Sequence, residues 1–333
     1  MKTRDSKIDC LRVLGILLII LAHCDAPKFI SDLRSFDVIL LVYLSAYVAP
    51  FERIEDKHSY YLYCRKRVQR LLKPTYIFII TYSVALFFLY YLIGRLDLFP
   101  PKQWINSFLM CEDSIGYVWI VKVYFINALL GPICNKIISR FENNVSFVLF
   151  IAIEITVYTF VKMLYINYIG ESYIGWILVD QWLMCCIAYL IVMQDCIWAK
   201  VNEKWKRYEY IIWLLVFIVT CIIDKNGFIF SPSTGKRPVN LHYLSFGMTV
   251  TLLLIRYIPA IKNSFIEYIS KNSFTLYLIH PIYILLFRIV KNKMDFSLFY
   301  LIEWACVFLL SVLTLWIVQK AKRFLLEKRI ISE

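Results

Sequence analysis

Charged residues are scarce in this chain, and their scarcity argues against a soluble globular protein. Asp, Glu, Lys and Arg make up 18% of the 333 residues, whereas hydrophobic residues make up 60%. Soluble domains are usually about 45–50% apolar and about a quarter charged. The chain also lacks a hydrophilic stretch long enough to form a separate soluble domain. We therefore expect a single membrane domain that covers residues 1–333.

Cysteine motifs are missing as well. The ten cysteines show no metal-binding or redox spacing, because Cys185 and Cys186 are adjacent and the others are scattered through apolar runs. We interpret them as small buried hydrophobic residues, and we expect no metal site. The net charge of +13 does not indicate a nucleic-acid partner, because the distribution of the basic residues matters more than their number.

What the chain has instead is a series of long apolar runs. A membrane-spanning helix needs about 20 mostly apolar residues, with a range of about 17 to 25. The aromatic content of 17% suits belts of Tyr and Trp at the membrane interfaces. The predicted fold is all-α and polytopic, with about ten membrane-spanning helices, of which the second and seventh are short. The predicted spans cover residues 8–26, 36–51, 74–94, 117–137, 144–164, 174–194, 210–224, 242–258, 272–290 and 299–319.

Lysine and arginine predict the orientation of these spans, because cytoplasmic loops carry an excess of both residues. With a cytoplasmic N-terminus, the inner segments hold 25 of these residues and the outer segments hold 10, while Lys122 and Lys162 fall inside helices. This bias favours both termini in the cytoplasm. The basic start from Met1 to Lys7 also resembles a signal peptide. A chain that goes on to span the membrane repeatedly needs no cleavage, so we expect this segment to be retained.

Arg12 and His23 are the most informative residues of the first predicted span. Ionisable side chains are costly in lipid and tend to mark functional sites. Eleven helical residues make about 20° more than three turns, so both side chains would share one helix face, about 16 Å apart. An imidazole can act as a base, an acid or a nucleophile near neutral pH. The alternative is a structural histidine between helices, and Arg12 on the same face favours a functional one.

Two further residues are candidates for the same site. His280 lies near the middle of the ninth predicted span, and Pro281 removes a backbone donor beside it. Kinked membrane helices often line cavities, and simple packing is an equal alternative. Asp37 begins the second predicted span and is close in sequence to His23. Its carboxylate could orient the imidazole, or it could cap the helix, which we slightly favour.

Arg67 and Arg70 belong to a basic run just before the third predicted span. On a helix, residues three apart point the same way, and paired guanidinium groups match the oxygens of phosphate. Composition alone favours the simpler interpretation, a positive-inside loop that binds anionic lipid. In the predicted topology, this run and Arg12 both lie near the cytoplasmic side.

Taken together, these motifs resemble the acyltransferase-3 family of polytopic membrane acyltransferases. The five matches follow the order of the family and run from residue 8 to residue 283. Ala46 stands where the family usually has glycine, and no acid follows Trp119 where some members have a glutamate. The motifs are Ile8-Asp9-Cys10-Leu11-Arg12 with the apolar run to His23, Phe36-Asp37 to Ser45-Ala46-Tyr47, Arg67-Val68-Gln69-Arg70 to Pro74, Val118-Trp119 to Pro132, and Ser273 to Tyr277-Leu278-Ile279-His280-Pro281.

The resemblance implies an O-acyltransferase that acylates an extracytoplasmic carbohydrate with cytoplasmic acyl-CoA as the donor. We expect acetyl-CoA, because acetyl transfer is the more frequent activity in a family that also transfers succinyl groups. His23 would be the catalytic histidine, with Asp37 and His280 as further catalytic candidates. Arg12, Arg67 and Arg70 would bind the donor. The expected setting is the cell membrane, with acyl-CoA, a glycan acceptor and the lipid bilayer as partners.

Two other functions compete with this hypothesis. A transporter of polysaccharide or lipid-linked oligosaccharide would also need a polar path, but it would act without acyl-CoA. A non-catalytic membrane subunit of a glycan-synthesis complex would keep glycan acylation unchanged in the variants His23→Ala and Arg67→Ala. The transporter hypothesis also gives no reason for an arginine and a histidine on one face of the first span.

Overall fold

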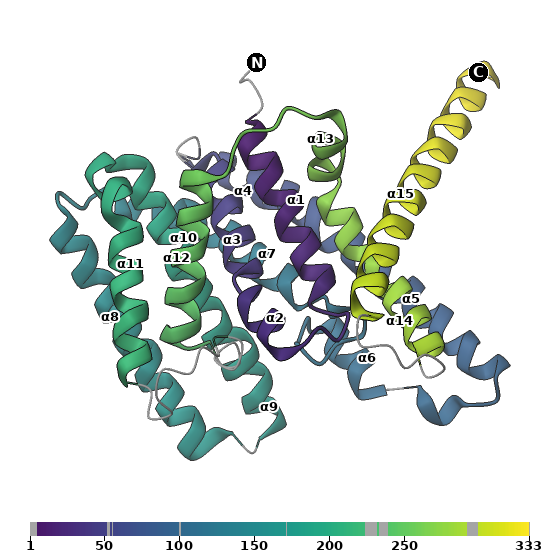
Figure 1. The fold of residues 1–333 in the computed structure, drawn as a ribbon, viewed down its shortest axis with the longest axis horizontal. Coiled ribbons are helices and arrows are strands. Elements are labelled where there is room, and N and C mark those ends of the chain that lie inside the picture. The colour runs from purple at the N-terminus through teal and green to yellow at the C-terminus, as the bar shows by residue number, and fades with distance from the viewer. Residues whose placement is uncertain are drawn as a thin grey trace. The chain divides into compact units, whose positions relative to one another are not determined.

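The part of the chain that the structure describes is mainly helical. The computed structural model describes residues 5–51, 54, 56–99, 101–170, 172–223, 232, 239–291 and 299–332. Over these residues the backbone forms α-helices joined by short 3-10 and π segments, and no β-strand (Figure 1). The predicted all-α class is therefore confirmed. Internal contacts divide the chain into two compact units.

Unit 1 combines the two ends of the sequence, Met1–Arg34 and Ile258–Glu333. Its helices are α1 (Ser6–Leu21), α2 (Lys28–Leu33), α13 (Ser264–Lys271), α14 (Ser273–Lys291) and α15 (Phe299–Ser332). α1 packs against α13, α14 and α15, and α14 also packs along α15 (Figure 1). The indole nitrogen of Trp304 donates to the carbonyl of Leu17 over 2.9 Å, which ties α15 to α1.

Unit 2 is the central part of the chain, Ser35–Tyr257. Its α-helices are α3 (Asp37–Val48), α4 (Lys57–Arg67), α5 (Lys73–Leu92), α6 (Pro101–Phe108), α7 (Trp119–Ile138), α8 (Asn144–Leu164), α9 (Tyr173–Gly175), α10 (Cys185–Val201), α11 (Glu203–Ile223) and α12 (Leu241–Tyr257). α3 packs against α7, α10 and α12 and buries most of its side chains. Gly247 of α12 permits this close approach, because a Cβ atom there would collide with the side chain of Ile39.

Within the described residues, five helices are long and apolar enough to cross a membrane, and they support a multi-pass membrane protein. The outer surface of α8 illustrates why: Phe147 and Tyr158 are its only buried residues, although the helix is strongly apolar. Such an apolar surface is unfavourable in water and suits lipid. The five helical stretches are Lys57–Leu92, Ile115–Ile138, Asn144–Ile169, Tyr173–Val201 and Phe299–Phe324.

The other five predicted spans are helical but shorter or more polar. They fall in α1, α3, α11, α12 and α14. α1 has 16 residues, a length of about 24 Å, whereas a bilayer core is about 30 Å thick. α11 is longer, but its first turns contain Glu203, Lys204, Lys206 and Arg207. The number of ten spans and the cytoplasmic location of both termini remain predictions.

The third predicted span starts earlier than expected. α4, the π segment Val68–Leu72 and α5 form one continuous helical stretch, Lys57–Leu92, so the basic run is helical rather than a loop. A capping box starts this stretch. Asp56 Oδ1 accepts from Ser59 N over 2.6 Å, and Asp56 N donates to Ser59 Oγ over 3.3 Å. The cap satisfies backbone donors well before the apolar residues begin, which explains the early start.

Candidate functional site

Arg12 lies in the first half of α1, one turn after a buried acid. Asp5 caps this helix, because its side chain accepts from Lys7 N over 2.9 Å. Asp9 is buried and accepts a hydrogen bond from the hydroxyl of Ser270 in α13 over 2.6 Å. Arg12 itself is half-buried. The bond between α1 and α13 therefore holds the segment that carries Arg12 in place within unit 1.

His23 lies just past the end of α1 rather than inside it. The helix ends at Leu21, and a turn follows that includes Asp25 with a positive φ of 48°. Because the chain leaves the helical path here, the predicted helix over residues 8–26 ends earlier than expected. The prediction that both Arg12 and His23 lie in this helix is therefore wrong, because only Arg12 does. The turn leaves the imidazole half-buried.

His280 lies within α14 and is fully buried. Its Nδ1 lies 2.6 Å from the carbonyl oxygen of Tyr277. A carbonyl oxygen can only accept, so Nδ1 carries the proton of this hydrogen bond. Pro281 explains why that carbonyl can receive the imidazole. In a regular helix the N–H of residue 281 would donate to the carbonyl of residue 277, and proline has no N–H.

The two histidines, which come from opposite ends of the sequence, stack on each other in unit 1. Their ring centroids are 5.5 Å apart and their planes differ by 25°. The ring of Tyr277 also contacts that of His280, with a centroid separation of 5.6 Å and a tilt of 45° between the planes. An imidazole that is only half-buried can still meet a substrate, and imidazole is a side chain that can accept and return a proton in catalysis.

The other predicted site residues belong to unit 2. Asp37 is the first residue of α3, is 1% exposed, and accepts from Val38 N over 2.7 Å. The prediction that Asp37 caps this helix is therefore wrong, because Phe36 occupies the cap position and no side chain caps α3. Arg67 ends α4 and its guanidinium lies 4.7 Å from the ring centroid of Tyr63. Arg70 lies in the π segment and is exposed. The role of Asp37 toward His23 and the role of the two arginines in donor binding remain predictions.

Sequence reasoning did not assign a role to Lys122, which is fully buried in α7. Its ammonium donates to the backbone carbonyl of Gln181 and lies 5.4 Å from the ring centroid of Trp182. The side chain of Gln181 accepts from Glu112 N over 2.8 Å and donates to Asp180 over 2.9 Å. A buried ammonium needs such partners. The only sequence signal for this cluster was a lysine in an apolar run.

Comparison with known proteins adds a family context to this geometry. A family model described as an acyltransferase domain, that of the acyltransferase-3 family, matches residues 5–320. The match covers nearly the whole chain and includes every candidate site residue in both units. No curated protein and no solved structure matches the chain.

Proposed function

The chain belongs to the acyltransferase-3 family of membrane acyltransferases, and from this premise we propose that it transfers an acetyl group from cytoplasmic acetyl-CoA to a hydroxyl of a cell-surface polysaccharide or lipid-linked glycan. The observation that carries the proposal is the stack of His23 on His280, with ring centroids 5.5 Å apart. Two imidazoles held together in an apolar protein provide a proton acceptor where a hydroxyl must be activated.

His23 is the general base in this proposal. Its imidazole takes the proton of the acceptor hydroxyl, and the oxygen attacks the carbonyl carbon of the thioester. The carbon–sulfur bond then breaks, the CoA thiolate leaves, and the imidazolium returns its proton to the thiolate. The products are the acetyl ester and free CoA. An acetyl group held briefly on His23 is an alternative course to the same products.

His280 has a narrower role because of its hydrogen bond to Tyr277. With the proton on Nδ1, a neutral His280 carries a lone pair on Nε2. It can accept a hydrogen bond there, but it cannot donate one to the oxyanion of the tetrahedral intermediate. We therefore assign His280 to position the ring of His23 rather than to stabilise that oxyanion.

Donor binding is assigned to Arg12, Arg67 and Arg70. CoA carries several anionic phosphate oxygens, and the planar donors of a guanidinium match them in pairs. In the predicted topology all three arginines lie toward the cytoplasm, where the donor is made. Asp37 completes the proposed set as the carboxylate that orients His23 and stabilises its cation, in addition to its bond to the start of α3.

The test compares surface glycan from the parental strain, a deletion strain and a strain with His23→Ala, each analysed by NMR for ester-linked acyl groups. We expect acetyl ester signals in the parental glycan, and their loss from both altered strains while the amount of glycan is unchanged. If both altered strains retain the parental pattern, the proposal fails for that glycan. If glycan itself disappears from the surface, the transporter hypothesis is favoured instead.

A further inference from the structure

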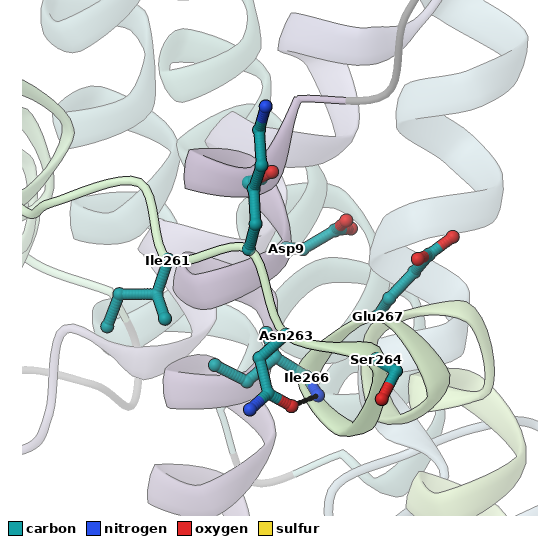
Figure 2. Close-up of a pocket in the computed structure, with 8 residues that line it drawn as sticks. Asp9, Ile261, Asn263, Ser264, Ile266 and Glu267 are labelled. Carbon is teal, nitrogen blue, oxygen red and sulfur yellow. Dashed lines mark hydrogen bonds between the residues drawn. The ribbon is translucent and has the colours of Figure 1, made fainter.

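A polar pocket lies in unit 1 at the start of α1 and α13, away from the stacked histidines. Its volume is about 400 Å³, which falls in the range of small-molecule sites, about 300–1,000 Å³. Figure 2 shows the carboxylates of Asp9 and Glu267 pointing the same way from two different helices. Its lining consists of Ser6, Asp9, Ile261, Lys262, Asn263, Ser264, Ile266 and Glu267.

Several side chains of this pocket form hydrogen bonds or an ion pair within the protein, and these contacts hold the pocket walls in place. Asp9 accepts from the hydroxyl of Ser270, and Glu267 forms an ion pair with Lys271 at 2.6 Å. Asn263 Oδ1 accepts from Phe265 N over 2.8 Å and caps α13. The positions of these groups are thus determined by the protein itself, as a preorganised binding site requires.

The mixture of charges narrows the class of ligand. Two carboxylates in the wall of this pocket disfavour a simple anion, whereas they suit hydroxyl and amino groups, as acids do when they bind a ribose. The exposed ammonium of Lys262 adds a point charge that suits phosphate. A nucleoside that carries phosphate presents both kinds of group, hydroxyl and amino donors together with anionic oxygens.

The position of the pocket relative to the histidines points to the same ligand. α1 rises about 18 Å from Asp9 to Leu21, and His23 follows in the turn after it. In the predicted topology the pocket end of α1 is cytoplasmic. The phosphopantetheine arm of CoA is long enough to cover a comparable span, with its nucleotide at one end and its thioester at the other.

From this pocket and its place on α1 we infer that unit 1 binds the nucleotide end of acyl-CoA between the starts of α1 and α13, with the arm directed along α1 toward His23. This inference rests on the proposed function and extends it by assigning an adenosine-binding site. That site consists of Asp9, Lys262, Ser264 and Glu267. Arg12, one turn beyond Asp9, would then meet the phosphates where the arm begins.

Equilibrium binding of radiolabelled CoA to the full chain in proteoliposomes tests the inference without knowledge of the acceptor. Two variants alter the pocket from its exposed rim: Lys262→Glu reverses a charge, and Ser264→Trp fills the space. We expect each to raise the Kd for CoA about tenfold, the size of one charge-assisted contact. Each should also weaken competition by adenosine 3′,5′-bisphosphate while leaving competition by pantetheine unchanged.

Lys320→Glu is the matched control, because Lys320 is an exposed lysine of unit 1 outside the pocket. It should change the Kd for CoA by less than about twofold, since screened surface charges have small effects. The inference is overturned if Lys262→Glu and Lys320→Glu have equal effects, or if the unaltered protein binds no CoA.

CoA binding that depends on Lys262, in a protein whose glycan lacks acetyl ester, would support the pocket and refute the proposed transfer. Acetyl ester in the glycan, together with a Kd for CoA that neither pocket variant changes, would support the proposed transfer and refute the pocket.

Discussion

His280 donates its Nδ1–H to the carbonyl oxygen of Tyr277 over 2.6 Å, within the same turn of α14. The next residue, Pro281, has no N–H to give to that carbonyl. A two-residue sequence, His-Pro, thereby selects one tautomer of a buried imidazole. The ring that stacks on His23 consequently presents a lone pair at Nε2 when it is neutral.

Pro281→Ala should separate the stability of α14 from its function. The new backbone N–H can donate to the carbonyl of Tyr277 and compete with the imidazole of His280. We expect a higher thermal unfolding midpoint, because proline inside a helix costs up to about 3 kcal/mol, together with about tenfold slower acetyl transfer. Unfolding by circular dichroism and the rate of ester formation measure the two effects. A faster or unchanged rate would refute a role for this hydrogen bond.

His23→Ala should abolish most of the transfer while leaving the fold intact. Loss of a general base typically lowers the rate by about 10²–10⁴-fold. The matched control is His58→Ala, because His58 is exposed at the start of α4, and its rate should stay within about twofold of the parental value. Initial rates of acetyl ester formation in membranes measure both variants. Equal small losses in the two would indicate that His23 serves only in packing.

Arg67→Ala and Arg70→Ala should weaken donor binding rather than chemistry. Each removes a guanidinium that we assign to the phosphates of CoA, so the KM for acetyl-CoA should rise about tenfold with little change in kcat. Arg65→Ala is the control, since Arg65 is exposed in the same helix. The KM should also become less dependent on salt in the two variants. An equal rise in all three would favour a general basic surface that binds anionic lipid.

Asp56 predicts a pH-dependent stability of the helix that begins at Lys57. Hydrogen bonds from Ser59, first from its backbone N–H and then from its hydroxyl, lower the pKa of Asp56 below its ordinary value of 3.8. A carboxyl with a lowered folded-state pKa stabilises the fold above its unfolded pKa, and this contribution is lost as the pH falls through the folded value. The thermal midpoint of Asp56→Ala should therefore lie below that of the parent at pH 7, and the two should converge toward pH 2.

Asp56→Asn is the control for this effect. Asparagine caps helices nearly as well as aspartate but does not titrate. Its midpoint at pH 7 should lie close to that of the parent, and it should lack the loss on acidification that belongs to residue 56. If Asp56→Ala remains equally below the parent at both pH values, the cap does not act through the charged carboxylate.

Local sequence properties were sufficient to predict most of the helices and the family. The apolar runs predicted helices in every span, because hydrophobicity over about 20 residues reports burial in lipid directly. The motifs from Ile8 to Pro281 also indicated the family, and the family model confirms it over residues 5–320. Errors occurred at two helix boundaries. α1 stops at Leu21, where a turn follows, and the helix that carries Arg67 starts at Lys57, where Asp56 caps it.

The sequence by itself determined the all-helical class and the membrane setting, since both follow from long apolar runs. It also determined the choice of Arg12, His23 and His280 as residues of interest, since each is an ionisable residue within such a run. Only the tertiary structure decided that His23 stacks on His280 and that Lys122 donates to the carbonyl of Gln181. Such pairs depend on how helices distant in sequence pack, and periodicity along one helix carries no information about its neighbour.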